Sequence, residues 1–377
     1  MQTVTTLRRA AAVALTTATL AATLLAPTST ASAEQVPLPV GPTSYSADGR
    51  YAVGERTMTL PSGVKVEVWY PARKKDVVGQ PEGSYDVVDW IPSIYNIPDG
   101  ASVPYPSGGV RGVPVAKGRF PLVVFSHGYA GFRTQSSALT AAIASWGFVV
   151  AAPEHPSRNL TRVLPSNAPP ATTTDVEDLQ QAISMVGKAN GAKRSWLFGH
   201  VNMKQIGALG HSAGGRAVES LASVDKRVDT FIGMAPGHDA ELAPVQKPSL
   251  VLAATDDEII TLDRIEAAYD TFAAPKRIVL FGGGHLLFSD LCDIGESDGG
   301  LLAVAELLGF PVPQSLIRLA TDGCIAPALE PSVALPAVQH TVIAQLRRVF
   351  GLDPTDAAFD GLVEAYPGVV SDSRSAQ

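Results

Sequence analysis

Hydrophobic and polar positions alternate with a two-residue period near the start of this 377-residue chain. Residues Tyr51–Leu60 and Val64–Tyr70 show this alternation on either side of Pro61-Ser62-Gly63, a pattern that predicts a β-hairpin. Residues 71–118 contain many prolines and glycines and little periodicity. We therefore expect a long ordered excursion over the surface between the hairpin and the next strand.

Short apolar runs alternate with longer helical patterns from residue 121 onward. The apolar runs are Pro121–Ser126, Gly147–Ala152, Gln205–Gly210, Thr230–Met234, Ser249–Ala254 and Arg277–Phe281. The helical patterns cover about 135–146, 173–189, 213–224 and 262–273. This alternation predicts an α/β fold, in which helices cover both faces of a mostly parallel sheet.

The part of the chain after the last predicted strand has a different character. Residues 290–330 contain both cysteines and the apolar run Leu301–Leu308, and an amphipathic helix is expected at about 334–350. A chain of this length can surround one extended sheet, so we predict a single domain over residues 34–377. Its core would span about 50–290, followed by an inserted cap-like segment at about 290–330 and C-terminal helices over 331–377.

The first 33 residues have the pattern of a secretory signal peptide. Arg8 and Arg9 precede the apolar stretch Ala10–Ala26, and the small residues Ala31-Ser32-Ala33 follow it. The apolar stretch is shorter than the roughly 20 residues that a membrane span needs, although an uncleaved anchor is the alternative. We expect cleavage before Glu34 and secretion to the outside of the cell without a stable membrane anchor. The general and the twin-arginine export routes both remain open.

Charge and cysteine content restrict the partners of the mature chain. The formal net charge is −7 and lysines and arginines do not cluster, so we expect no nucleic-acid partner. Cys292 and Cys324 would reach an oxidising compartment, where a disulfide persists. We predict that they pair, because neither lies in a CxxC or His-rich context that would favour a catalytic or metal-binding role. We expect no metal and no organic cofactor.

A candidate nucleophile lies directly after one of the predicted strands. Gly210-His211-Ser212-Ala213-Gly214 follows the apolar run Ile206–Leu209 and precedes a helical pattern, which is the context that a G-x-S-x-G elbow requires. The glycines are needed because a Cβ at either flank of this tight turn would collide with the neighbouring strand or helix. The sequence therefore predicts Ser212 as a nucleophile; the alternative is a glycine-rich turn with an inert serine.

A serine hydroxyl needs an imidazole to take its proton and later deliver that proton to the leaving group. His285 ends the sequence Phe281-Gly282-Gly283-Gly284-His285 immediately after the last predicted strand, and we predict it as the base. His211 should point away from Ser212 and is expected among the substrate-binding residues. Structural roles are expected for the five other histidines, which are His127, His155, His200, His238 and His340.

The third member of a serine triad is a carboxylate, expected between the serine and the histidine in the chain. Asp256 and Asp257 follow the predicted strand Ser249–Ala254. A shift of one residue on a loop changes which carboxylate faces inward, so both remain candidates. We favour Asp257, and Asp239 is a third, weaker alternative.

Ester cleavage also needs donors for the developing oxyanion, and backbone N–H groups supply them without reorganisation. We predict the N–H of Ala213, just after the nucleophile, as one donor. The second donor should come from the loop after the strand Pro121–Ser126, and there we predict the N–H of Tyr129. The ring of Tyr129 would then line the substrate pocket; the alternative is a merely packed aromatic side chain.

Several of these segments resemble a known group of enzymes. The stretches are Val68–Pro71, Trp90–Pro92, Phe125–Thr134, Gly147–His155 and Gly210–Gly215, and together they resemble the secreted platelet-activating-factor acetylhydrolases. The combination is also similar to cutinase-like polyester hydrolases and to the dienelactone hydrolase group. The likeness covers roughly residues 50–290 and implies the α/β-hydrolase fold.

The relatives place the acid differently. In the acetylhydrolases the acid follows the strand after the nucleophile helix, here Thr230–Met234, where only Asp239 lies nearby. The cutinase-like placement corresponds to Asp257. Dienelactone hydrolases carry cysteine as nucleophile, from which Ser212 departs. Residues 290–330 match neither group, and we expect substrate choice to depend on them.

Taken together, the sequence predicts a secreted serine hydrolase that cleaves a small-molecule, lipid or polymer carboxylic ester through a Ser-His-Asp triad. A lipid acetylhydrolase and a peptidase or amidase on the same fold are rival enzymes. The rival from another class is a catalytically silent binding protein, which would require a broken triad.

Overall fold

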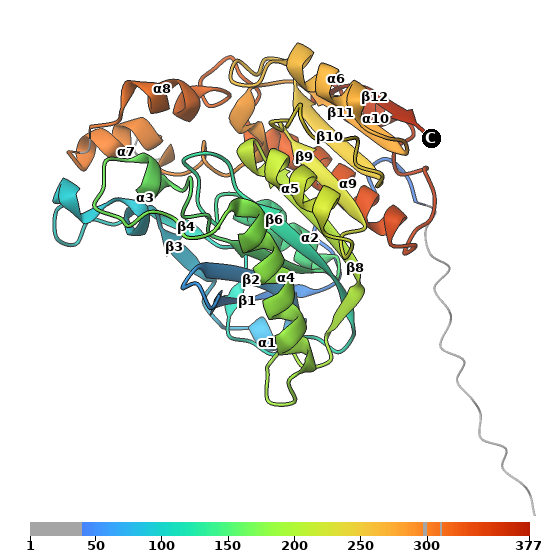
Figure 1. Cartoon of the computed structure of the whole chain (residues 1–377), viewed down its shortest axis with the longest axis horizontal. Coiled ribbons are helices and arrows are strands. Elements are labelled where there is room, and N and C mark those ends of the chain that lie inside the picture. Colours follow the sequence, from blue (N-terminus) through green and yellow to red (C-terminus); the bar gives the residue numbers. More distant parts are fainter. Residues whose placement is uncertain (1–39, 297–299, 310) are drawn as a thin grey trace, which may run out of the picture. The chain divides into compact units, whose positions relative to one another are not determined.

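A ten-stranded sheet forms the centre of the unit Val40–Gln377. The computed structural model describes residues 40–296, 300–309 and 311–377, so the predicted signal peptide lies outside the described residues. The strand order is β12-β11-β10-β9-β8-β6-β7-β2-β1-β5 (Figure 1). Neighbouring strands run parallel from β11 to β7, whereas β2 and β12 join antiparallel at the two sides.

The strands of the parallel part are continuous apolar runs, as expected for a sheet that is covered on both faces. Their bounds are β6 Phe120–Ser126, β7 Val149–Pro153, β8 Val201–His211, β9 Thr230–Met234, β10 Ser249–Ala254 and β11 Lys276–Phe281. The hairpin strands are β1 Ala52–Thr59 and β2 Lys65–Ala72. Every residue of β6, β7, β9 and β10 is buried.

Two groups of helices cover the two faces of the sheet (Figure 1). Apolar residues of α4 (Asp175–Gly191), α5 (Ala213–Val224) and α6 (Leu262–Thr271) belong to one core cluster. Residues of α2 (Ser137–Ser145) and α9 (Pro331–Val349) belong to a second core cluster. The predicted α/β fold with a mostly parallel sheet is therefore confirmed.

The excursion between β2 and β6 contains only short elements. They are α1 Lys74–Val77, the 3-10 helices Val87–Trp90 and Ser93–Tyr95, and the strands β3 Ser84–Asp86, β4 Pro104–Pro106 and β5 Val110–Arg111. Strands β3 and β4 pair with each other, whereas β5 adds to the edge of the main sheet. A further short helix, α3 (Leu160–Val163), lies between β7 and α4.

The C-terminal region differs in part from its prediction as a set of helices over 331–377. Helices α9 and α10 (Leu362–Ala365) form, but the chain then ends in strand β12 (Val370–Ala376), which pairs antiparallel with β11. Six of the seven β12 residues are Ser, Asp, Arg or Ala, so the strand carries little of the β-branched and aromatic signal that identifies strands in a sequence. Pairing with the exposed edge of β11 provides its hydrogen-bond partners instead.

Within residues 290–330, the described stretches 290–296, 300–309 and 311–330 contain α7 (Leu301–Leu307) and α8 (Gln314–Thr321), and we call this region the cap segment. The cysteines at its two ends form the disulfide Cys292–Cys324, which confirms the predicted pairing. Asp290 fastens the beginning of the segment, because its Oδ2 accepts hydrogen bonds from Ser137 Oγ at 2.7 Å and from the Ala138 N–H at 3.0 Å. The cap is thus tied down on the side where it leaves the sheet.

Within the described part of the chain, no helix is both long and apolar enough to cross a membrane.

We expect the disulfide to stabilise the fold without supplying a catalytic group. The bond closes a loop with a sequence separation of 32, for which the chain-entropy model gives roughly 3–4 kcal/mol. A C292S/C324S double variant should therefore lose about 3 kcal/mol of unfolding free energy in urea melts, while its turnover of a short ester changes by less than about threefold, roughly 0.7 kcal/mol. Unchanged melts, or two free thiols in the denatured oxidised wild type, would contradict this prediction.

Candidate active site

A sharp turn joins β8 to α5 (Figure 1). Ser212 is the residue between these two elements. Its backbone has φ 57° and ψ −121°, a conformation that non-glycine residues rarely adopt. The flanking glycines permit this turn: a Cβ on Gly210 would overlap the carbonyl of Gly214, and one on Gly214 would overlap the carbonyl of Ser126. A Cβ on Gly215 would likewise press against Pro236. The helix can therefore start directly against the ends of the central strands.

The structure brings three of the predicted residues into one hydrogen-bonded chain. His285 Nε2 lies 2.9 Å from Ser212 Oγ, and His285 Nδ1 lies 2.8 Å from Asp257 Oδ2. All three side chains are buried. The second oxygen of Asp257 accepts the N–H groups of Ile259 and Ile260, each at 2.8 Å, so the carboxylate is held from both sides.

The other two candidate acids lie elsewhere. Asp256 is exposed, and its Oδ2 accepts the N–H of Gly283 at 3.2 Å. Asp239 lies on the loop after β9, where its side chain accepts the N–H of Glu241 at 3.2 Å. Of the three candidates, Asp257 alone contacts His285 among the described residues.

The two predicted oxyanion donors are placed differently by the fold. Ala213 is the first residue of α5, where helix N–H groups lack an intrahelical acceptor and the helix dipole favours negative charge. Tyr129 lies on the loop of residues 127–131 after β6, which we call the oxyanion loop. Gly128 on this loop approaches Ser212 closely, since a Cβ there would lie 3.4 Å from Ser212 Cβ. Neither the N–H of Ala213 nor the N–H of Tyr129 has a hydrogen-bond acceptor among the described residues.

His211 is buried next to His285, with 5.0 Å between the ring centres. Its Nε2 donates to the backbone oxygen of His285 at 2.9 Å, and its Nδ1 accepts from Gln135 Nε2 at 3.0 Å. Burial and the neighbouring His285 lower the pKa of His211 to about 3, so the ring is neutral. Gln135 Oε1 in turn accepts the N–H of Gly128 at 3.0 Å. Through Gln135, His211 therefore links the backbone of His285 to the oxyanion loop, and it also lines the cleft.

Sequence reasoning missed Gln135 and a buried arginine, Arg158, which contacts the oxyanion loop. Arg158 Nη1 donates to the carbonyl oxygens of His127 and, at 2.8 Å, of Gly128. Neither residue lies in a recognisable motif, and each is brought to the site by a contact between separate segments. No local signal in the sequence could have identified them.

Ser212 and His285 lie at the base of a cleft that encloses about 970 Å³ of empty space, its open mouth included. Apolar side chains from three parts of the chain line it: the excursion, the α3 region and the cap segment. The Val, Leu and Ile residues that these three parts contribute are Val87, Val88, Ile91, Val103, Leu160, Leu164, Leu291, Leu301, Leu302, Val304, Leu308, Val312, Leu316 and Leu319. Among the described lining residues there is no Asp, Glu, Lys or Arg.

One group of possible metal ligands exists in the described part of the chain. Ligand atoms of His155, Asp175 and Asp178 lie within 4.8 Å of one another. Arg158 Nε donates to Asp175 Oδ2 at 2.6 Å, so a guanidinium already supplies the positive charge there. The group is better explained as a buried ion-pair network than as a metal site.

The proteins and families that are similar to this chain include the following. The family model described as platelet-activating factor acetylhydrolase, isoform II, matches residues 111–182, which include the oxyanion loop and Arg158. The platelet-activating factor acetylhydrolase of Cavia porcellus is 22% identical over 286 residues, which are 65% of this chain and 61% of the relative. Lipase 1 of Moraxella sp. (strain TA144) is 33% identical over 87 residues, which are 22% of this chain and 27% of that lipase.

The chain thus spans less than two thirds of the length of these two relatives. Its mostly parallel sheet, with Ser212 at the strand-to-helix turn, agrees with the superfamily to which the sequence resemblance pointed. This chain is an α/β-hydrolase-fold protein that is similar to platelet-activating factor acetylhydrolases and to a bacterial lipase.

Proposed function

We propose that this protein is a secreted serine esterase that hydrolyses uncharged, largely apolar carboxylic esters. The observation that carries the proposal is the chain Ser212–His285–Asp257 at the base of a cleft without charged lining. The similarity to an acetylhydrolase and a lipase supports ester hydrolysis as the reaction class.

The contacts of the three residues support an acyl-enzyme mechanism. Ser212 Oγ attacks the ester carbonyl carbon while His285 Nε2 takes the hydroxyl proton, and Asp257 stabilises the imidazolium through Nδ1–H. The carbonyl oxygen becomes an oxyanion that accepts the N–H groups of Ala213 and Tyr129. His285 then protonates the leaving alcohol, and a water molecule, deprotonated by His285, releases the acid from Ser212.

The lining of the cleft supports an uncharged substrate. Burying a charged headgroup without a paired charge is costly, whereas each buried methylene contributes about 0.8 kcal/mol. A neutral ester with an aliphatic or aromatic acyl part therefore fits better than a charged one. A phospholipid acetylhydrolase is the second candidate, supported by the family similarity.

Secretion is part of the same proposal. The signal-peptide pattern of residues 1–33 and the disulfide Cys292–Cys324 both suit an oxidising compartment outside the cytoplasm. A panel of p-nitrophenyl esters of rising chain length, a polyester film and an acetylated phospholipid would separate the substrate classes. Preference for the phospholipid would favour the second candidate.

We expect the S212A variant to lose ester hydrolysis and labelling by a fluorophosphonate, because only the nucleophilic oxygen is removed. Turnover should fall by about 10⁶-fold, as in knock-outs of comparable serines. Thermal unfolding checks that the fold is intact. Labelling of a different serine, or retained turnover, would contradict the assignment.

The acid is tested by three amide substitutions. Asp257→Asn keeps the shape but lets His285 adopt the wrong tautomer, so turnover should fall by about 10⁴-fold. The matched controls Asp256→Asn and Asp239→Asn should each cost less than about tenfold, or 1.4 kcal/mol. If the Asp239→Asn variant lost its activity while the Asp257→Asn variant stayed active, the acid of the triad would be Asp239, on the loop after β9.

The cap segment should set the length of the acyl chain. Ala305 is buried on α7 and lines the cleft, so Ala305→Phe should occupy space that a long acyl chain needs. We expect kcat/KM for a long-chain ester to fall at least about tenfold, the effect of two lost methylene contacts, with little change for the acetate. Ala303→Phe on the same helix, outside the cleft lining, is the control. Equal losses for short and long esters would contradict this role.

A further inference from the structure

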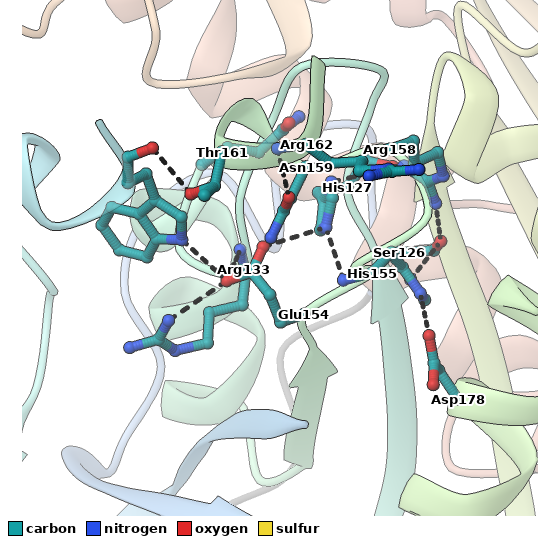
Figure 2. Close-up of polar contacts among 12 residues, drawn as sticks. Ser126, His127, Arg133, Glu154, His155, Arg158, Asn159, Thr161, Arg162 and Asp178 are labelled. Atoms are coloured by element: carbon teal, nitrogen blue, oxygen red, sulfur yellow. Dashed lines mark hydrogen bonds and ion pairs between the residues drawn. The ribbon is translucent and has the colours of Figure 1, made fainter. Parts of the chain in front are cut away.

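A buried arginine lies behind the oxyanion loop. Arg158 is 6% exposed and follows β7 on the segment that leads into α3. Figure 2 shows its guanidinium next to His127 and Ser126. Ester hydrolysis as proposed above gives this side chain no direct part, and the cleft does not reach it.

The amino groups of the Arg158 guanidinium donate hydrogen bonds to the end of β6 and to the start of the oxyanion loop, which precede Tyr129. One amino group, Nη1, has two hydrogens, and it donates to the carbonyl oxygens of His127 and Gly128. The other, Nη2, donates to Ser126 Oγ at 2.8 Å. Three consecutive residues are thus held by one planar, rigid group.

The carbonyl of Gly128 receives two further donors. His127 Nδ1 lies 2.9 Å from it, and the N–H of Gly131 lies 3.2 Å from it. His127 Nε2 accepts the N–H of His155 at 3.1 Å, so the ring proton belongs on Nδ1 and points to Gly128. Burial, followed by the charge of Arg158, lowers the pKa of His127, which keeps the ring neutral.

The Gly128 carbonyl and the Tyr129 N–H belong to the same peptide group. In a planar trans peptide these two bonds point in opposite directions. Fixing the carbonyl oxygen toward Arg158 therefore turns the N–H of Tyr129 the other way, away from the guanidinium. Gly128 lies against Ser212, so the free N–H is on the loop that faces the nucleophile.

The loop needs this support because its backbone is strained. Ala130 has φ 57°, a conformation that costs a non-glycine residue about 1–2 kcal/mol. The N–H of Ala130 donates to the backbone oxygen of Arg158 at 2.9 Å, and the N–H of Leu160 donates to Gly131 at 2.9 Å. The segment that carries Arg158 is thus bonded to the loop through its backbone as well.

The charge of Arg158 is balanced on the side away from the cleft. Its Nε donates to Asp175 Oδ2 at 2.6 Å, at the beginning of α4. Burial alone raises the pKa of Asp175, but the charge of Arg158 and hydrogen bonds from Ser157 and Arg158 hold it below its ordinary value. The pair therefore stays ionised, and the orientation of the guanidinium is fixed by α4.

We propose that Arg158 is the positioning residue of the oxyanion site: by holding the Gly128 carbonyl it aims the Tyr129 N–H at the oxyanion that forms on Ser212. The proposal rests on the proposed serine esterase function. The proposal predicts that substitution of Arg158 weakens stabilisation of the transition state. Substrate binding should not change, because Arg158 does not line the cleft.

The test compares Arg158→Met and the milder Arg158→Lys with wild type on a short p-nitrophenyl ester. Removing a whole oxyanion donor costs about 10²–10³-fold in kcat, so a misdirected donor should cost about 10–100-fold while KM stays within about threefold. Affinity for a trifluoromethyl ketone, whose adduct with Ser212 carries an oxyanion, should fall in parallel. Affinity for the non-reactive alcohol analogue of that ketone should not change.

Arg277→Met is the matched control, since Arg277 is also largely buried and paired with an aspartate but lies on β11, outside the cleft lining. Its kinetics should match wild type. Rates are divided by the amount of serine that fluorophosphonate labels, so misfolded protein does not contribute to them. If Arg158→Met does not fold, the comparison of Arg158→Lys with wild type provides the test.

The outcomes separate this inference from the function on which it rests. If the wild-type protein neither hydrolyses esters nor reacts with the fluorophosphonate, the proposed function is wrong. If wild type is active and the Arg158 variants keep its kcat, or lose kcat without losing ketone affinity, the positioning role is overturned.

Discussion

The close approach of α5 to the ends of β6 and β8 is the constraint on which the site depends. Gly210 and Gly214 remove the Cβ atoms that would separate helix and strands, and the strained backbone of Ser212 is the consequence. Such strain persists only where the surrounding structure over-determines it. Here the N–H of Ser212 donates to the backbone oxygen of Met234 at the end of the buried strand β9, which holds the turn in place.

Two kinds of surroundings meet at this serine. Behind the oxyanion loop lies a network of hydrogen-bonded groups that includes Ser126, His127 and Arg158 (Figure 2). In this network the charges of Arg158 and Asp175 neutralise each other. In front of it lies a cleft with an apolar wall. Fixed dipoles act more strongly where water is excluded, so a rigid polar loop beside an apolar cleft suits the stabilisation of a transient negative charge.

Different parts of the chain supply the hydrogen-bonded chain of Ser212, His285 and Asp257 and the wall of the cleft. Ser212, Asp257, His285 and the loop of residues 127–131 follow the ends of sheet strands, whereas much of the cleft wall comes from α7 and α8. The disulfide and Asp290 tie the cap at its ends. Asp322 of the cap segment accepts the N–H of His285 at 3.1 Å, so this part of the cap also holds the histidine, whereas α7 contributes only to the wall of the cleft.

The sequence by itself determined the features that depend on local pattern. Continuous apolar runs predicted the central strands, and Gly210–Gly214 predicted the sharp turn at Ser212, because strand burial and turn sterics involve neighbouring residues only. The tertiary structure decided what depends on distant contacts. It placed Asp257 rather than Asp256 against His285, since one residue of register on a loop reverses a side chain, and it paired the polar strand β12 with β11. It also brought Arg158 and Gln135 to the oxyanion loop, because hydrogen bonds between segments leave no periodic trace in the chain.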